Sequence, residues 1–356
     1  MNGQKKGKPY CECFVPISID KWFERIHIKP EMNVLLQQIY RDIGRLEGLN
    51  TLLNCEEVEN INRLIGRINV MHCQTDEDQS LGVMHFFSGV YEDESVMEAY
   101  RSQIVLCSDI NALRFQHREK FIILQNTIWA LRKEFHPVSP ERIGDCIDEL
   151  LVAASKYTNS FRRHNEVMDP ILFSGLLFYQ LLTLAPYEKN NILYSACAVE
   201  KYMQKLQMLP EVTIPFAKFI QDNINECDDR MAGTRQACNM DQWLLFYLDI
   251  LDKALNAACG FVEVQHRCMI KSMNVVNKLK NISVNMKDRM YKELGLMQQM
   301  PLFRIEDVMN HCGITHSTAA KMVNIFIGMK IVKQVDDKQR YCVYEYSPLM
   351  ECIRKM

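Results

Sequence analysis

The spacing of hydrophobic positions predicts a chain that is mainly helical. Apolar residues recur at intervals of three and four over 31–53 and again over 241–258, which places them on one face of an α-helix. Similar patterns predict helices over about 95–113, 140–157, 191–209 and 215–224. The main body of the protein is therefore expected to be all-α.

One stretch, 171–184, is hydrophobic on all sides, so we expect it to lie in the interior as a central helix. The pair Asp169-Pro170 begins this helix, and Ala185-Pro186-Tyr187 interrupts it before the next helix starts at about Asn191. The sequence thus predicts a buried helix, a short corner and a second helix.

Two regions depart from the helical pattern. Over 119–133, two short β-prone runs flank the polar pair Gln125-Asn126, which predicts a β-hairpin. After Pro301, a short helix over 303–311, a turn at Gly313, a second helix over 317–328 and two alternating segments follow in order. That order is typical of a winged helix-turn-helix.

These elements suggest a domain organisation, since 356 residues suit two or three domains. We expect an N-terminal tail (1–30), an N-terminal helical region (31–118), a helical core (119–265), a basic linker helix (266–300) and a winged helix (301–356). The linker is expected to belong to one long helix over about 261–300.

Charge is distributed unevenly along the chain. From His266 to the end there are 15 Lys and Arg residues against 8 acidic ones, a net charge of +7, whereas the remainder has 27 against 36. The basic end is a candidate for contact with nucleic acid, and a solvated helix face is the alternative.

The cysteine spacing and the hydropathy argue against a disulfide-bonded, metal-binding or membrane protein. The 14 cysteines are scattered through helical patterns, and the Cys11-Glu12-Cys13 cluster lacks paired CxxC spacing, so we expect reduced thiols and no metal site. No run of about 18 apolar residues occurs, and residues 1–10 do not lead into an apolar segment. We therefore expect a cytoplasmic protein without a membrane partner.

The run from Asp169 to Leu193 resembles, without a gap, the central helix and active-site loop of the Fic family. The segment Ile43-Gly-Arg-Leu-Glu-Gly-Leu49 is similar to an N-terminal helix of that family, and Asp241-Gln-Trp-Leu-Leu-Phe-Tyr247 to a later one. The 119–133 hairpin stands where the family has a flap that docks target proteins. The resemblance implies a mainly α, Fic-like helical core with a small β-hairpin flap, followed by a winged-helix (α+β) domain.

The same resemblance implies a degenerate active site. Ala185 stands where active relatives have the histidine that accepts the target hydroxyl proton, and losing a general base typically lowers the rate by about 10²–10⁴. Lys189 replaces the acidic residue that holds magnesium. The phosphate-binding glycines and arginines correspond to Asn190, Ile192, Leu193 and Ala196, and the positions that keep the loop shape are Pro186, Tyr187 and Asn191. We therefore expect no catalytic residues and no cofactor.

Two functions follow from these observations. The first is a regulatory or binding protein that uses the winged helix to bind DNA. Its candidate contacts are His316, Ser317, Thr318, Lys321, Asn324, Lys330 and Arg340. Because Asp336-Asp337 would repel phosphate and winged helices also mediate protein contacts, a homodimer is a further expectation. The resemblance of the 119–133 hairpin to a docking flap implies a protein partner there.

The second function is a protein adenylyltransferase with an altered site. Such an enzyme would transfer AMP from ATP, with Mg²⁺, to a protein hydroxyl. Tyr187 or Lys189 would then have to replace the missing histidine as the proton carrier.

Overall fold

The computed structural model describes residues 6–8, 11–13, 17–23, 26–73, 138, 140–163, 168–186, 191–280, 282–335 and 342–355. The fold is mainly helical, with a small three-stranded antiparallel sheet near the C-terminus and a short antiparallel pair near the N-terminus. The helix expected over 95–113 and the hairpin expected over 119–133 lie outside the described residues.

Most of the described elements are helices, and the short strands lie toward the two ends of the chain. Helices α1 to α3 precede the body helices α7 to α11, and α12 is the longest of the described helices. Helices α13 to α16 are interspersed along the chain with the strands of the C-terminal sheet. The strands are β1 (Lys6–Lys8), β2 (Cys11–Cys13), β3 (Leu302–Phe303), β4 (Val332–Gln334) and β5 (Tyr344–Tyr346). The helices are α1 (Ile19–Phe23), α2 (Pro30–Asn50), α3 (Cys55–Cys73), α7 (Pro140–Arg162), α8 (Pro170–Leu184), α9 (Asn191–Lys205), α10 (Phe216–Asp222), α11 (Ile224–Ala237), α12 (Asp241–Lys278), α13 (Val284–Gln299), α14 (Ile305–Cys312), α15 (His316–Gly328) and α16 (Ser347–Lys355).

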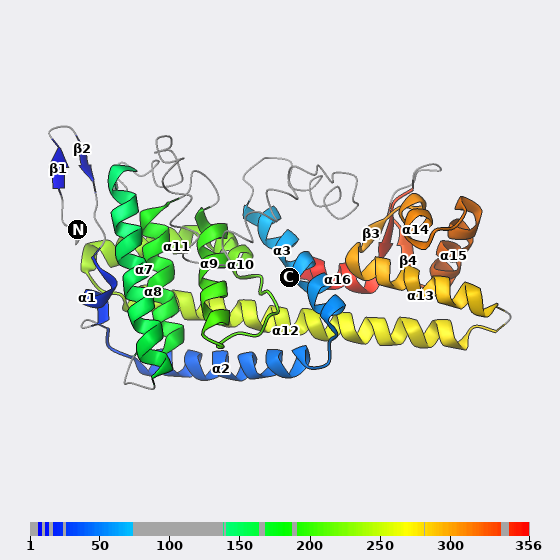
Figure 1. Cartoon of the computed structure of the whole chain (residues 1–356), viewed down its shortest axis with the longest axis horizontal. Helices are drawn as coiled ribbons and strands as arrows, with labels where there is room; N and C mark the ends of the chain where they lie inside the picture. Colours follow the sequence, from blue (N-terminus) through cyan, green and yellow to red (C-terminus); the bar gives the residue numbers. More distant parts are fainter. Residues whose placement is uncertain are drawn as a thin grey trace.

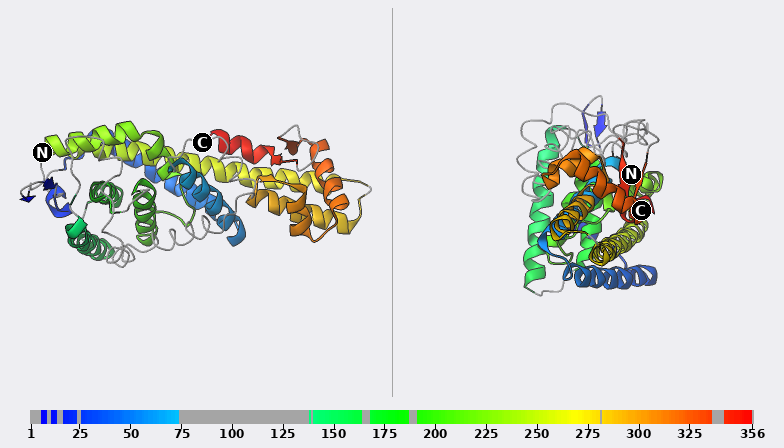
Figure 2. Two further views of the ribbon diagram at one scale, coloured as in Figure 1. Left: turned by 90° about the horizontal axis from the view of Figure 1, so that it is seen from above. Right: turned by 90° about the vertical axis from the view of Figure 1, so that its right-hand side faces the viewer.

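Helix α12 runs along much of the long axis of the molecule and links the two ends of the fold (Figure 1). Its 38 residues span about 57 Å at 1.5 Å per residue. Helix α2 lies beside its first half, where Lys29 pairs with Asp241 at 3.0 Å and Arg45 with Glu263 at 2.8 Å. Viewed from above, α12 continues from the helical body into the C-terminal elements (Figure 2).

Helix α8 forms the centre of the body, and every one of its residues is buried. Asp169 caps its first turn, since the carboxylate accepts a hydrogen bond from the Ile171 amide at 2.8 Å. On the other side, the Trp243 indole donates to the Gly175 carbonyl at 2.9 Å, which ties α12 to α8. The predicted buried central helix is confirmed.

The single basic helix expected over about 261–300 is wrong. Helix α12 ends at Lys278, and α13 begins at Val284 and returns alongside it (Figure 1). Ser283 starts the new helix, because its side chain accepts a hydrogen bond from the Met286 amide at 3.3 Å. The capped turn before α13 therefore separates two helices where the sequence predicted one continuous helix.

Other differences concern where helices end. Helix α7 extends to Arg162, α9 ends at Lys205, and α12 continues far beyond residue 258. The two-residue strand β3 also takes Phe303 out of the short helix expected over 303–311. Across the described residues, no helix combines the length and the apolar character that crossing a membrane requires.

Candidate functional site

The corner between α8 and α9 contains the positions that the resemblance assigns to catalysis. Ala185 ends α8 in a left-handed conformation (φ 43°, ψ 58°), and its amide donates to the Leu181 carbonyl at 3.0 Å. Pro186 is buried behind it, and residues 187–190, which include Tyr187, Lys189 and Asn190, lie outside the described part of the chain. The described corner thus offers a methyl group and a proline ring, neither of which accepts a proton.

The first turns of α9 are equally poor in charge. Asn191 is buried at the start of the helix, and the side chains of Ile192, Leu193 and Ala196 belong to the hydrophobic core. Apolar side chains therefore fill the described positions that the sequence resemblance assigns to phosphate-binding glycines and arginines. The side chains of Ile192, Leu193 and Ala196 contribute packing energy and carry no group that binds an anion or a metal.

The C-terminal elements are two short helices joined by a turn at Gly313, together with a three-stranded sheet and a last helix. Strand β5 lies between β3 and β4, with Leu302 opposite Glu345 and Val332 opposite Tyr346. Gly313 makes the turn between α14 and α15 possible, because it adopts a positive φ of 62°, which costs a glycine little. The helix, glycine turn, helix and strand pair expected from the sequence are present in that order.

Helix α15 has one face in the core and one in solvent. Ala319, Met322, Val323 and Phe326 are buried and hold the helix against the module. The solvent face carries Ser317, Lys321 and Asn324, spaced by four and three residues and therefore aligned along one side. His316 is exposed at the first position of the same helix.

A group of hydroxyls marks the start of α15. The Thr315 hydroxyl lies 2.9 Å from that of Thr318 and 3.2 Å from that of Ser317. Thr318, a predicted contact, is half-buried. Thr315 was not among the predicted contacts, and it is exposed. A threonine directly before a helix is a recognisable capping position, and that signal could have identified Thr315.

The remaining predicted contacts lie near the strands. Lys330 follows α15 and is exposed, with a positive φ of 60° that most residues avoid. The Ile331 amide donates to the Phe326 carbonyl at 3.1 Å, so Lys330 occupies the position that glycine usually takes after a helix. Arg340 lies outside the described residues.

One nearby lysine is already paired. The buried carboxylate of Glu345 on β5 binds Lys333 at 2.9 Å and also pairs with Arg354 on α16. Burial alone would raise the pKa of Glu345, but hydrogen bonds from Arg354 and Lys333 hold it below its usual value. This arrangement links β5 to β4 and to α16, and it leaves Lys321 and Lys330 as the cations of the predicted surface within the described residues.

The described residues contain no group of three or more His, Cys, Asp or Glu side chains that could hold a metal ion. No protein-family model matches the sequence, and a search of curated proteins gives no match. Among solved structures, the chain is similar to a Fic family protein from Desulfovibrio desulfuricans G20, whose crystal structure was determined at 2.70 Å resolution. The two share 14% sequence identity with a TM-score of 0.46, and the match covers 91% of this chain and 98% of that one.

Proposed function

We propose that this protein is a catalytically degenerate, Fic-like regulator that binds DNA through a winged helix. The observation that carries this proposal is the solvent face of α15, which aligns Ser317, Lys321 and Asn324 along the second helix of a helix-turn-helix. In proteins of that class, the second helix enters the major groove and places such side chains against base edges and phosphates.

The arrangement of the module supports this assignment. Helix α13 leads into β3, the two helices follow, and β4 and β5 close a sheet in the order β3-β5-β4. This order of helices and strands supports the winged-helix proposal, in which the segment between β4 and β5 would be the wing. Lysine at position 321 can bind phosphate, and asparagine at 324 can form paired hydrogen bonds with adenine.

The corner between α8 and α9 supports the degenerate half of the proposal. A nucleotidyl transfer needs a base for the attacking hydroxyl and preorganised donors for the phosphates. Ala185, Leu193 and Ala196 provide neither, since they carry hydrocarbon side chains packed into the core. The proposed function accordingly uses no ATP and no magnesium.

DNA binding is tested by titrating the full chain with a pool of random-sequence duplexes between about 50 and 200 mM salt. We expect affinity to fall steeply with salt, and Lys321→Ala to lower the slope of log K against log salt by about 1. Lys205→Ala is the matched control, because Lys205 is an exposed lysine at the far end of α9. Equal losses for the two variants, or no binding at 50 mM salt, would refute DNA binding through α15.

The degenerate site is tested separately. Incubation with α-labelled ATP and Mg²⁺ should leave the protein and a cell lysate unlabelled. Covalent label on a protein that is lost on Lys189→Ala or Tyr187→Phe would contradict this half of the proposal. It would establish the adenylyltransferase alternative instead.

A further inference from the structure

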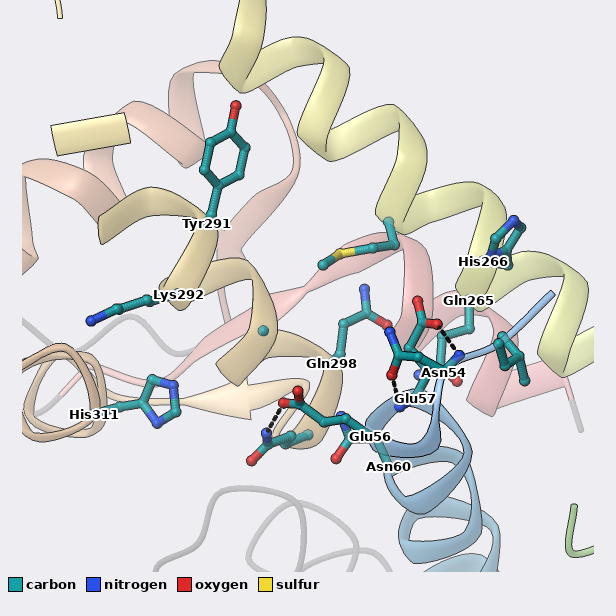
Figure 3. A pocket seen from close by; sticks show the side chains of 14 residues that line it. Asn54, Glu56, Glu57, Asn60, Gln265, His266, Tyr291, Lys292, Gln298 and His311 are labelled. Atoms are coloured by element: carbon teal, nitrogen blue, oxygen red, sulfur yellow. Dashed lines mark hydrogen bonds between the residues drawn. The ribbon is translucent and has the colours of Figure 1, made fainter. Parts of the chain in front are cut away.

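A pocket of about 370 Å³ lies where the helical body meets the C-terminal module (Figure 3). Its walls come from the start of α3 and the two residues before it, the second half of α12, the middle and end of α13 and the end of α14. Volumes of a few hundred Å³ are typical of sites for small molecules. None of its lining residues belongs to α8, α9 or the corner between them, so the pocket is a different site from the corner at Ala185.

Buried amide side chains distinguish this pocket from an ordinary packing defect. Gln265, Gln298 and Asn60 line it and are 4%, 5% and 6% exposed. The side-chain oxygen of Gln265 has no hydrogen-bond partner among the described residues, although it is fully removed from solvent. An unpartnered buried acceptor is costly, so a native structure normally supplies a partner for it.

The polar groups on the α3 side are fixed in place. Asn54 and Glu57 cap α3 reciprocally, with two hydrogen bonds of 2.9 Å. Figure 3 shows the Gln298 side chain reaching toward this pair, while Lys292 and His311 lie on the opposite side. The pocket therefore presents a fixed pair, the Asn54 amide and the Glu57 carboxylate, on one side and a lysine and an imidazole on the other.

The charges argue against a phosphorylated ligand. Glu56 and Glu57 supply two carboxylates to the lining, and Lys292 is its one lysine, with no arginine among the lining residues. Phosphate sites usually use arginine forks, lysines or free helix N-termini. Here the start of α3 is already capped, because the Asn54 side chain accepts from the Glu57 amide and the Glu57 carboxylate accepts from the Asn54 amide.

We propose that the pocket binds an uncharged, planar molecule with adjacent hydrogen-bond donors and acceptors, the class to which nucleobases and nucleosides belong. A primary amide offers a donor and an acceptor side by side and can bond to such an edge in paired fashion. Leu53 and Met269 provide apolar surface for the faces of the ring. The occupant would touch the body through α3 and α12 and the module through α13 and α14.

The experiment measures the thermal stability of the full chain with adenosine, guanosine, cytidine and uridine, their free bases and their 5′-monophosphates, each up to about 1 mM. We expect at least one nucleoside or base to raise the melting temperature in a saturable way. The matching monophosphate should bind more weakly than its nucleoside, because of Glu56 and Glu57.

Gln265→Leu separates binding from folding. It removes the unpartnered amide and should raise the melting temperature of the ligand-free protein, while lowering affinity for the nucleoside about five- to tenfold. Gln37→Leu, at an exposed position of α2, is the control and should leave affinity unchanged.

Three results would overturn the proposal. A protein that responds to none of these compounds has a water-filled pocket. A response that persists unchanged in Gln265→Leu comes from elsewhere in the molecule. Tighter binding of the monophosphate than of the nucleoside would show that Glu56 and Glu57 do not disfavour a phosphate in the pocket.

Discussion

Replacing Glu293 with glutamine should stabilise the protein in a pH-dependent way. Glu293 lies on the buried face of α13 between Met290 and Met297, its side chain is fully buried, and neither carboxylate oxygen has a partner among the described residues. Burial raises the pKa of this carboxyl from 4.5 to about 8. The charged form is therefore strongly disfavoured in the folded state.

The sign and size of the effect follow from proton linkage. Between pH 4.5 and pH 8, the unfolded chain has released a proton that the folded chain keeps, so this group lowers the free energy of unfolding as pH rises. The loss is about 1.4 kcal/mol per pH unit, or about 3 kcal/mol at pH 7. Below pH 4.5 both states are protonated and the contribution disappears.

Urea unfolding of the wild type and of Glu293→Gln at pH 5, 6, 7 and 8 measures this difference. Glutamine stays neutral at every pH, so its advantage should be small at pH 5 and reach about 3 kcal/mol at pH 7. Glu47→Gln, at an exposed position of α2, is the control for a generic loss of charge. A difference that stays constant from pH 5 to pH 8 would refute the reasoning, because only an ionising buried carboxyl produces the slope.

Two further changes test the packing of α8 and its end. Gly175→Ala should destabilise the protein by about 1–3 kcal/mol in the same urea assay, because the new Cβ would lie 2.8 Å from the Tyr247 ring and 3.0 Å from Leu244. Gly233→Ala is the control and should not destabilise it, since Gly233 has open space around it. Equal effects of the two variants would show that helix propensity dominates. Ala185→Gly should stabilise by about 1 kcal/mol by relieving the left-handed conformation, and a loss of stability would mean that the conformation is not strained.

Much of the fold could be predicted because its strongest signals are local. All-round hydrophobicity identified α8, and spacing by three and four identified the buried stripe of α12. The length of α12 was missed, because the sequence placed one helix over 241–258 and a separate one from about 261. Phe261, Val262 and Gln265 continue the buried face, and the helix runs through Gly260 without interruption. Tertiary packing here outweighs a propensity cost of about 1 kcal/mol.

The solvent face of α15 could be predicted from sequence, whereas the pocket near Gln265 could not. The exposed stripe of α15 follows from the period of one helix, so Lys321 and Asn324 could be named from sequence, whereas the half-burial of Thr318 depends on its neighbours. The pocket near Gln265 could not be predicted. Its lining is gathered from α3, α12, α13 and α14, whose side chains meet only after the chain has folded.

Because one uninterrupted helix belongs to both ends of the molecule, their relative orientation is a matter of helical phase. Each residue added within α12 turns everything beyond it by about 100° and shifts it by about 1.5 Å. Seven added residues nearly restore the angle, whereas two or five would point α15 away from its present direction. The number of residues in α12 thus sets the direction in which the C-terminal module faces relative to the helical body.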